Sequence, residues 1–277
     1  MPDSDSPLSP PRVALIGFGE AGATFARAGC WPGARGWDLL PERRALMKDC
    51  GVEAARDAAS TVEQADIVLS LVTADSALPA AQAYAELLPR GALWCDMNSV
   101  APQTKRAAAD AVEAAGGRYV DVAVMAPVDP AALGVPLLVA GPHAGAGEAA
   151  LNALGFAKTR VVGDEVGRAS AIKMIRSVMV KGLEALSSEC AAAADAAGVF
   201  DEVMASLDAS EKAAGWAEKV AYNRERMATH GLRRAAEMEE SARTLQGLGI
   251  DPVMTRGTVQ LQRAAGEKTK NERKTAA

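Results

Sequence analysis

The chain has 277 residues, 49% of them hydrophobic, 23% charged and only 4% aromatic. These values exclude global disorder and collagen-like repeats, and they disfavour binding of single-stranded nucleic acid through stacked bases. The net charge of −5 and the dispersed cysteines, Cys30, Cys50, Cys95 and Cys190, predict no basic surface for DNA or a membrane and no metal or dithiol motif. We therefore expect a cytoplasmic protein that has no nucleic-acid or membrane partner and binds no metal.

The first half of the chain has the pattern of an α/β domain. Residues 1–11 are rich in Pro, Ser and Asp, so we expect a disordered tail rather than a secretory signal. From 12 to 165, short apolar runs alternate with helical patterns, which predicts a mainly parallel sheet covered by helices on both faces. The predicted strands are Val13–Ile16, Ile67–Val72, Ala92–Asp96, Tyr119–Val122 and Leu137–Val139.

The second half has the pattern of an all-helical domain. Strand signals stop after Val161, and a helical pattern without proline runs from 167 to 199. Further helices are predicted over 201–210, 216–229, 232–248 and 252–265. We expect a helical domain over 166–266, joined to the first by the long helix, and a disordered Lys-rich tail over 267–277.

A glycine-rich turn joins the first predicted strand to a helix. Its residues are Gly17, Phe18, Gly19, Glu20, Ala21 and Gly22. Gly17 permits a tight turn, Gly19 lets the backbone approach a pyrophosphate, and Gly22 allows helix and strand to pack closely. A turn needed only for packing is the alternative. The position between a strand and a helix favours a Rossmann fold, a doubly wound parallel sheet, with a dinucleotide at this turn.

Asp38 lies where a second strand is expected to end, 21 positions after Gly17. A carboxylate there accepts hydrogen bonds from both adenosine ribose hydroxyls and repels a 2′-phosphate, which favours NAD over NADP. NADP stays possible because Arg43 and Arg44 follow, and an arginine near this point accommodates the extra phosphate. Glu20 is expected to point to solvent at the start of the helix.

These features resemble the β-hydroxyacid dehydrogenases, the family of 3-hydroxyisobutyrate and 6-phosphogluconate dehydrogenases, over about residues 12–266. Residues 96–102 are similar to the family's Asp-x-Ser-Thr-x-x-Pro stretch beside the nicotinamide, with Ser99 in it. Residues 167–173 are similar to the lead-in to the family's lysine, which is the general acid/base. The resemblance thus implies that Lys173 is catalytic and that Ser99 lies at the cofactor and the substrate.

The resemblance also implies a homodimer, because the family's helical domains pack together. We assign the residues at the end of the strand predicted over 67–72 to the cofactor site; they are Leu71, Val72 and Thr73.

Two departures from the family pattern concern the substrate. Where the family has Ser-Gly-Gly to hold a carboxylate, this chain has Met125, Ala126 and Pro127, and proline lacks a backbone donor. The family's asparagine after the lysine is Ser177 here. We assign a set of residues to the substrate: Ser99, Met125, Ala126, Pro127, Lys173, Ser177 and His230. His230 is expected between two helices, where it either caps one or contacts substrate.

Lys173 has a chemical rationale of its own. At 100° per residue, Lys173, Ser177 and Lys181 share a polar ribbon, a pattern that is also typical of a solvated surface. Hydride transfer to a carbonyl leaves an alkoxide, which a lysine ammonium stabilises and protonates. We therefore expect an NAD(P)-dependent oxidoreductase acting on CH–OH of a small hydroxy/oxo compound, a β-hydroxy acid. The alternative is a non-catalytic dinucleotide-binding sensor or scaffold. Relatives that reduce imines generally lack the lysine.

Overall fold

The computed structural model describes residues 10–210 and 214–275, and the chain divides into two compact units, 1–176 and 177–277. The boundary falls inside the long helix α7 (Arg168–Ala197), not at residue 165 as the sequence predicted. The first turns of α7 therefore belong to the α/β unit. Most of the tail predicted over 1–11 lies outside the described residues.

The first unit is built on one eight-stranded sheet with the order β3-β2-β1-β4-β5-β6-β7-β8. Neighbouring strands are parallel except β6 and β7, which are antiparallel. The strands are β1 (Val13–Ile16), β2 (Arg35–Trp37), β3 (Glu53–Ala54), β4 (Ile67–Ser70), β5 (Leu93–Asp96), β6 (Arg118–Val124), β7 (Leu137–Ala140) and β8 (Thr159–Gly163). The Rossmann architecture predicted from the sequence is confirmed.

The two strands that the sequence did not predict, β3 and β8, form the edges of the sheet. Neither contains a fully buried residue, and β3 has only two residues. An edge strand need not be apolar on both faces, so the continuous apolar run that marks the central strands is absent.

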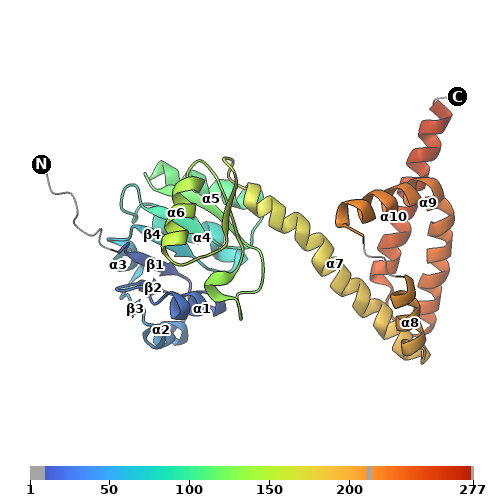
Figure 1. Ribbon diagram of the computed structural model, residues 1–277, viewed down its shortest axis with the longest axis horizontal. Coiled ribbons are helices and arrows are strands. Elements are labelled where there is room, and N and C mark those ends of the chain that lie inside the picture. The colour runs from blue at the N-terminus through green and yellow to red at the C-terminus, as the bar shows by residue number, and fades with distance from the viewer. Residues whose placement is uncertain (1–9, 211–213, 276–277) are drawn as a thin grey trace, which may run out of the picture. The chain divides into compact units, whose positions relative to one another are not determined.

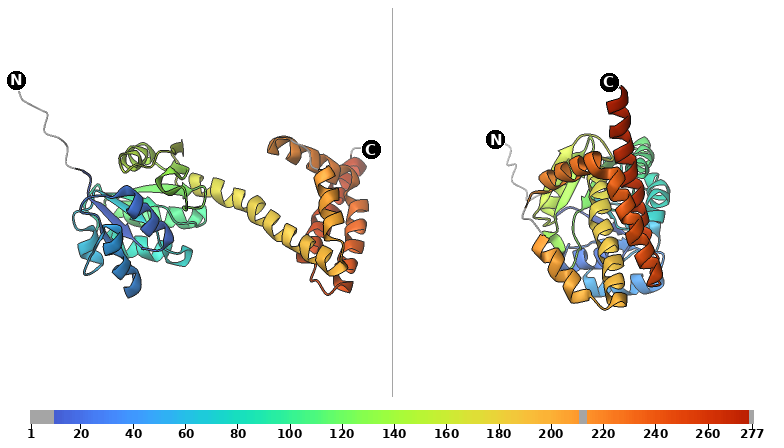
Figure 2. Two further views of the ribbon diagram at one scale, coloured as in Figure 1. Left: turned by 60° about the horizontal axis from the view of Figure 1, so that its bottom comes forward. Right: turned by 90° about the vertical axis from the view of Figure 1, so that its right-hand side faces the viewer.

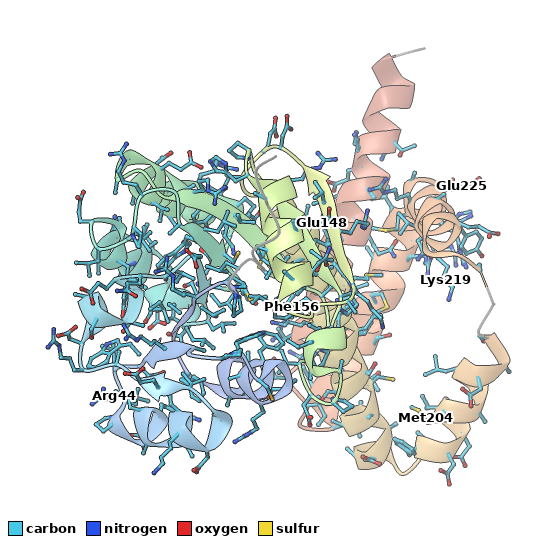
Figure 3. The ribbon with its side chains drawn as sticks, turned by 60° about the vertical axis from the view of Figure 1, so that its left-hand side comes forward. Arg44, Glu148, Phe156, Met204, Lys219 and Glu225 are labelled. Carbon is cyan, nitrogen blue, oxygen red and sulfur yellow. The ribbon has the colours of Figure 1, made fainter. Side chains whose placement is uncertain are left out.

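Helices cover both faces of the sheet (Figure 1). Alternate residues of β1 show this directly, since Val13 and Leu15 join one buried cluster and Ala14 and Ile16 join the other. The few aromatic residues are concentrated in these cores, and Phe156 packs edge-on against Phe25 with ring centroids 5.1 Å apart (Figure 3). The helices are α1 (Glu20–Gly29), α2 (Pro41–Met47), α3 (Ala58–Val62), α4 (Ala77–Ala85), α5 (Pro102–Ala114) and α6 (Ala144–Ala153).

The strand order places the topological switch point of the sheet at the carboxyl ends of β1 and β4. From β1 the chain winds outward through β2 to β3, then returns to β4 on the other side of β1. The connections therefore diverge between β1 and β4. In open α/β sheets this switch point is where ligands bind.

The second unit consists of the rest of α7 with α8 (Phe200–Ser210), α9 (Trp216–Gly247) and α10 (Val253–Thr275). Helices α9 and α10 lie side by side (Figure 1, Figure 2) and touch through glycines. A Cβ at Gly231 would overlap the backbone carbonyl of Gln262 and lie 2.9 Å from Gly266 N. The Glu189 carboxylate of α7 accepts hydrogen bonds from Met254 N (2.8 Å) and Thr255 N (2.9 Å) at the start of α10.

The helical unit corrects three expectations. The helices predicted over 216–229 and 232–248 are one helix, α9, because Gly231 serves the close crossing with α10 and does not end a helix. His230 is therefore an exposed residue within α9, not a residue between helices. Helix α10 continues to Thr275, through most of the tail predicted over 267–277. None of the described helices has the length and apolar character needed to cross a membrane.

Candidate cofactor and catalytic site

The glycine turn between β1 and α1 contains two glycines that the packing of the fold requires, independently of any ligand. Gly17 has φ +86°, in the region that favours glycine, and a Cβ there would lie 2.6 Å from the carbonyl oxygen of Leu71 at the end of β4. A Cβ at Gly22 would lie 2.9 Å from Gly17 O, so α1 packs directly on the turn. The close approach of Leu71 and Val72 to Gly17 brings the end of β4 to the turn, and their assignment to the cofactor site stays a prediction.

Gly19 differs from these two glycines. A Cβ built there meets no atom within 4 Å, so the space above Gly19 is open. Gly19 is also the N-cap of α1, and no side chain caps this helix start. The N–H groups of the first turn are therefore not capped by a side chain, and they lie at the positive end of the helix dipole, where an anion is stabilised. Glu20 is exposed, as expected.

Asp38 lies directly beside this turn. Its Oδ2 accepts a hydrogen bond from Phe18 N (2.7 Å), and its Oδ1 accepts one from Leu40 N (2.9 Å). Gly17 N donates to Trp37 O (2.9 Å), which fixes the end of β2 against the turn. A carboxylate has about four lone-pair sites, so each oxygen retains capacity for a ribose hydroxyl.

Arg44 is held at the same end of β2 from helix α2 (Figure 3). Its Nη1 donates to Asp38 O (2.5 Å) and Leu39 O (3.1 Å), and its guanidinium lies 4.7 Å from the centroid of the Trp37 ring. The backbone carbonyls and the indole face together anchor this cation. A positive charge is therefore held at the backbone carbonyls of Asp38 and Leu39.

The open Gly19 cradle, the uncapped start of α1 and the Asp38 carboxylate fit a dinucleotide. The N–H groups after Gly19 would hold the diphosphate, and Asp38 would hold the adenosine ribose. Thr73, also assigned to this site, is exposed, and its hydroxyl donates to Asp75 (2.5 Å). Among the described residues, no three His, Cys, Asp or Glu side chains gather into a set that could hold a metal.

Lys173 and Ser99 meet within the first unit. The Lys173 ammonium donates a hydrogen bond to Ser99 Oγ (2.6 Å). Ser99 is exposed in the segment that follows β5, and Lys173 is half-exposed near the start of α7. The two residues are 74 positions apart in the sequence. The structure therefore brings together the two residues for which the resemblance implied a role in the reaction.

A buried charged cluster lies beneath these two residues, and its lysine is one that sequence reasoning missed. Lys105 of α5 is fully buried, with its Nζ 2.9 Å from Asp96 Oδ1 and 3.5 Å from Asp121 Oδ1. Tyr119 donates its hydroxyl to Asp96 Oδ2 (2.6 Å). Burial and the Asp96 carboxylate raise the pKa of Tyr119 far above its usual value, so this hydroxyl stays protonated. The only sequence signal was one lysine in an alanine-rich helix.

The substrate residues predicted after β6 contribute few backbone donors. Met125 is half-buried and its N–H donates to Pro136 O (2.9 Å), while Ala126 and Pro127 are exposed. Pro127 has no N–H, so the segment differs from an anion cradle made of backbone amides. Ser177 and His230 belong to the second unit, and their assignment to the substrate stays a prediction.

Comparison with known proteins identifies the family. Residues 12–163 match the family model described as the NAD binding domain of 6-phosphogluconate dehydrogenase. The chain belongs to the β-hydroxyacid dehydrogenase family. Residues 194–265 match a domain of unknown function, DUF1932. This β-hydroxyacid dehydrogenase family member thus carries an NAD(P)-binding domain followed by a distinct helical domain, and family membership makes it an oxidoreductase.

Solved structures match more than nine-tenths of the chain. A conserved hypothetical protein from Sinorhizobium meliloti 1021 is 37% identical, with a TM-score of 0.61, covering 93% of this chain and 90% of that one. A conserved protein of unknown function, described as structurally similar to 3-hydroxyacid dehydrogenases, is 29% identical with a TM-score of 0.60, covering 96% and 99%. An imine reductase from Myxococcus stipitatus, in complex with NADP+, is 19% identical with a TM-score of 0.73, covering 93% and 95%. The last likeness concerns the fold.

Proposed function

We propose that this family member transfers hydride between NAD(P) and a CH–OH or C=O group of a small polar compound, a β-hydroxy acid, with Lys173 as general acid/base. The observation that carries the proposal is the 2.6 Å hydrogen bond from Lys173 to Ser99. Ser99 follows β5, which is two strands from β1 and its glycine turn. At about 4.8 Å per strand this is roughly 10 Å across the sheet, a distance that an extended dinucleotide spans.

The proposed chemistry gives Lys173 and Ser99 distinct roles. Bound NAD(P)H supplies the hydride, and in the opposite direction NAD(P)+ accepts it. In reduction, the Lys173 ammonium gives a proton to the carbonyl oxygen as negative charge develops there. In oxidation, the neutral Lys173 amine takes the proton of the substrate hydroxyl. Ser99 orients Lys173 Nζ and offers a hydroxyl to the same substrate oxygen.

A substrate panel tests this function. The purified protein would be mixed with NAD+ or NADP+ and β-hydroxy acids, and separately with NADH or NADPH and the corresponding oxo acids or cyclic imines, while nicotinamide absorbance is followed. We expect turnover of a hydroxy/oxo acid pair with a kcat/KM at least about tenfold above that of any imine. Turnover restricted to imines would overturn the CH–OH assignment. Cofactor binding without turnover of any compound would favour the alternative, a dinucleotide-binding sensor or scaffold.

For the cofactor we propose NAD rather than NADP, because the Asp38 carboxylate would repel a 2′-phosphate. Arg44 already donates to two backbone carbonyls and stacks on Trp37, so its guanidinium is engaged in the protein. Replacing Asp38 by Asn removes the negative charge and keeps one acceptor oxygen. We expect the Kd for NADH to rise about tenfold and that for NADPH to fall, measured by nicotinamide fluorescence.

Asp49, exposed and close to α2, provides the matched control, since Asp49→Asn removes a charge away from the turn. In this control, the Kd for NADH and the Kd for NADPH should each stay within about twofold of the value for the unaltered protein. Equal or tighter binding of NADPH by the unaltered protein would contradict the role of Asp38.

We also propose a homodimer, because α7 exposes large apolar side chains. Ile175 and Val178 are 72% and 75% exposed, and Met179 and Leu183 are each 42% exposed. Apolar stretches of this kind mark protein interfaces. Sedimentation is expected to give twice the chain mass of 28.6 kDa. Val178→Asp should shift the mass to that of one chain, whereas the unaltered protein sedimenting as a monomer would refute the dimer.

A further inference from the structure

We propose that Lys105, Asp121 and Ser170 are positioning residues that hold Lys173 against Ser99. The inference rests on the proposed function, because it concerns the placement of the proposed acid/base. None of the three needs to contact the substrate. They act through the buried cluster beneath the Lys173–Ser99 pair.

The cluster begins with two carboxylates on neighbouring strands. Asp96 of β5 and Asp121 of β6 are direct partners in the parallel register, and both are fully buried. Lys105 is the cation between them, and its Nζ also donates to Asp96 O (2.6 Å). One ammonium thus faces two carboxylates. Buried charges of this kind are costly unless they are paired and hydrogen-bonded, so the excess negative charge requires further donors.

The start of α7 supplies these donors. Asp121 Oδ2 accepts hydrogen bonds from Gly167 N (3.0 Å) and Ser170 N (3.2 Å). Gly167 has φ +97°, and a Cβ there would lie 3.1 Å from Pro102 O, so the helix start fits closely against α5. A carboxylate at the N-terminus of a helix is further stabilised by the helix dipole. The Asp121 carboxylate therefore fixes where α7 begins.

The same turn of α7 is tied to the segment that carries Ser99. The buried Ser170 hydroxyl donates to Val100 O, next to Ser99 in the chain. On the other side of Ser99, Asn98 N donates to Asp96 Oδ1 (2.9 Å). Lys173 follows Ser170 by three positions, so the two side chains leave α7 on the same face. Both partners of the Lys173–Ser99 hydrogen bond are thus held by one buried network.

The consequence is a constraint on the acid/base that the glycine turn and Asp38 do not share. The glycine turn and Asp38 lie on β1 and β2, away from β5 and β6 in the sheet order. A displacement of a reacting group by about 1 Å can cost about a hundredfold in rate. Loosening the cluster should therefore lower kcat while the cofactor Kd stays as it is.

The test uses Ser170→Ala as the mild variant and Asp121→Asn as the stronger one in the full chain. Thr61→Val is the matched control, because Thr61 of α3 is also a buried residue with a hydroxyl that donates to a backbone carbonyl. Its partner is Asp57 O, at 2.8 Å. Three quantities would be measured: kcat and its pH profile, the Kd for NADH, and the rate at which trace acetic anhydride labels Lys173, read by mass spectrometry. Exposed Lys158 provides the internal reference for labelling.

We expect Ser170→Ala to lower kcat about tenfold, to leave the Kd for NADH within about twofold, and to raise labelling of Lys173 about threefold relative to Lys158. Asp121→Asn should change the same quantities further and shift the pH profile, whereas Thr61→Val should change none of them. Unchanged labelling and kcat in a folded Ser170→Ala protein would overturn the proposal. If Asp121→Asn does not fold, the kcat and the Lys173 labelling of Ser170→Ala are sufficient to test the proposal.

The labelling separates this inference from the proposed function. If Lys173→Met retains turnover, Lys173 is not the acid/base and the proposed function fails. The labelling ratio still reports whether the network holds Lys173, because it needs no substrate. If the cluster served only stability, the Ser170→Ala and Asp121→Asn variants would have a lower melting temperature. Their ratio of Lys173 to Lys158 labelling and their pH profile of kcat would then be unchanged.

Discussion

Replacing Lys173 by Met is expected to lower kcat by about 10²–10⁴-fold, the range that a positioned acid/base contributes. Methionine keeps the length of the side chain and removes both its charge and its proton. The developing charge on the substrate oxygen would then lose its proton donor, and Ser99 Oγ would lose the donor at 2.6 Å. The cofactor Kd should stay within about twofold, since the glycine turn lies on another part of the sheet.

Steady-state kinetics with the substrate found in the panel would measure this effect. Lys181→Met is the matched control, because Lys181 is exposed on the same helix and lies two turns beyond Lys173. The control should retain kcat within about twofold, as usual for a surface site. A loss of less than about tenfold in Lys173→Met would refute the acid/base assignment.

The second large effect is expected at the glycine turn, where Gly19→Ala and Gly17→Ala should have opposite signatures. Gly19 has φ −75°, which any residue adopts, and its Cβ position is open. Gly19→Ala should therefore change the free energy of unfolding by no more than about 1 kcal/mol. The new methyl group would occupy the space for the diphosphate, and we expect the Kd for NADH to rise about a hundredfold, or about 2.7 kcal/mol.

Gly17→Ala should instead destabilise the fold. An alanine would be strained at φ +86° and would overlap Leu71 O, so we expect a loss of about 1–3 kcal/mol of stability. Thermal unfolding and NADH fluorescence titration would separate the two variants. Unchanged NADH affinity in Gly19→Ala would show that the diphosphate does not lie over this turn.

The parts of the site that were predictable from sequence are those whose chemistry is local. The glycine spacing and the acid at Asp38 lie within one strand–helix–strand unit, so chain geometry alone brings them together. The central strands were equally readable, because burial on both faces demands continuous apolar runs. Strands β3 and β8 were not predicted, because edge strands need not be apolar on both faces. Helix α9 was predicted as two helices, because a glycine at a helix crossing resembles a glycine at a helix end.

The sequence by itself determined the fold class, and it predicted the cofactor turn and, through the family resemblance, the lysine that we propose as acid/base. Only the tertiary structure decided that Lys173 reaches Ser99 and that Lys105 lies buried between Asp96 and Asp121. These contacts depend on the pairing of β5 with β6 and on the docking of α7 against Asp121. Interactions between residues so distant in the chain exist only once the strands are in register, because no local pattern encodes which buried charges will face one another.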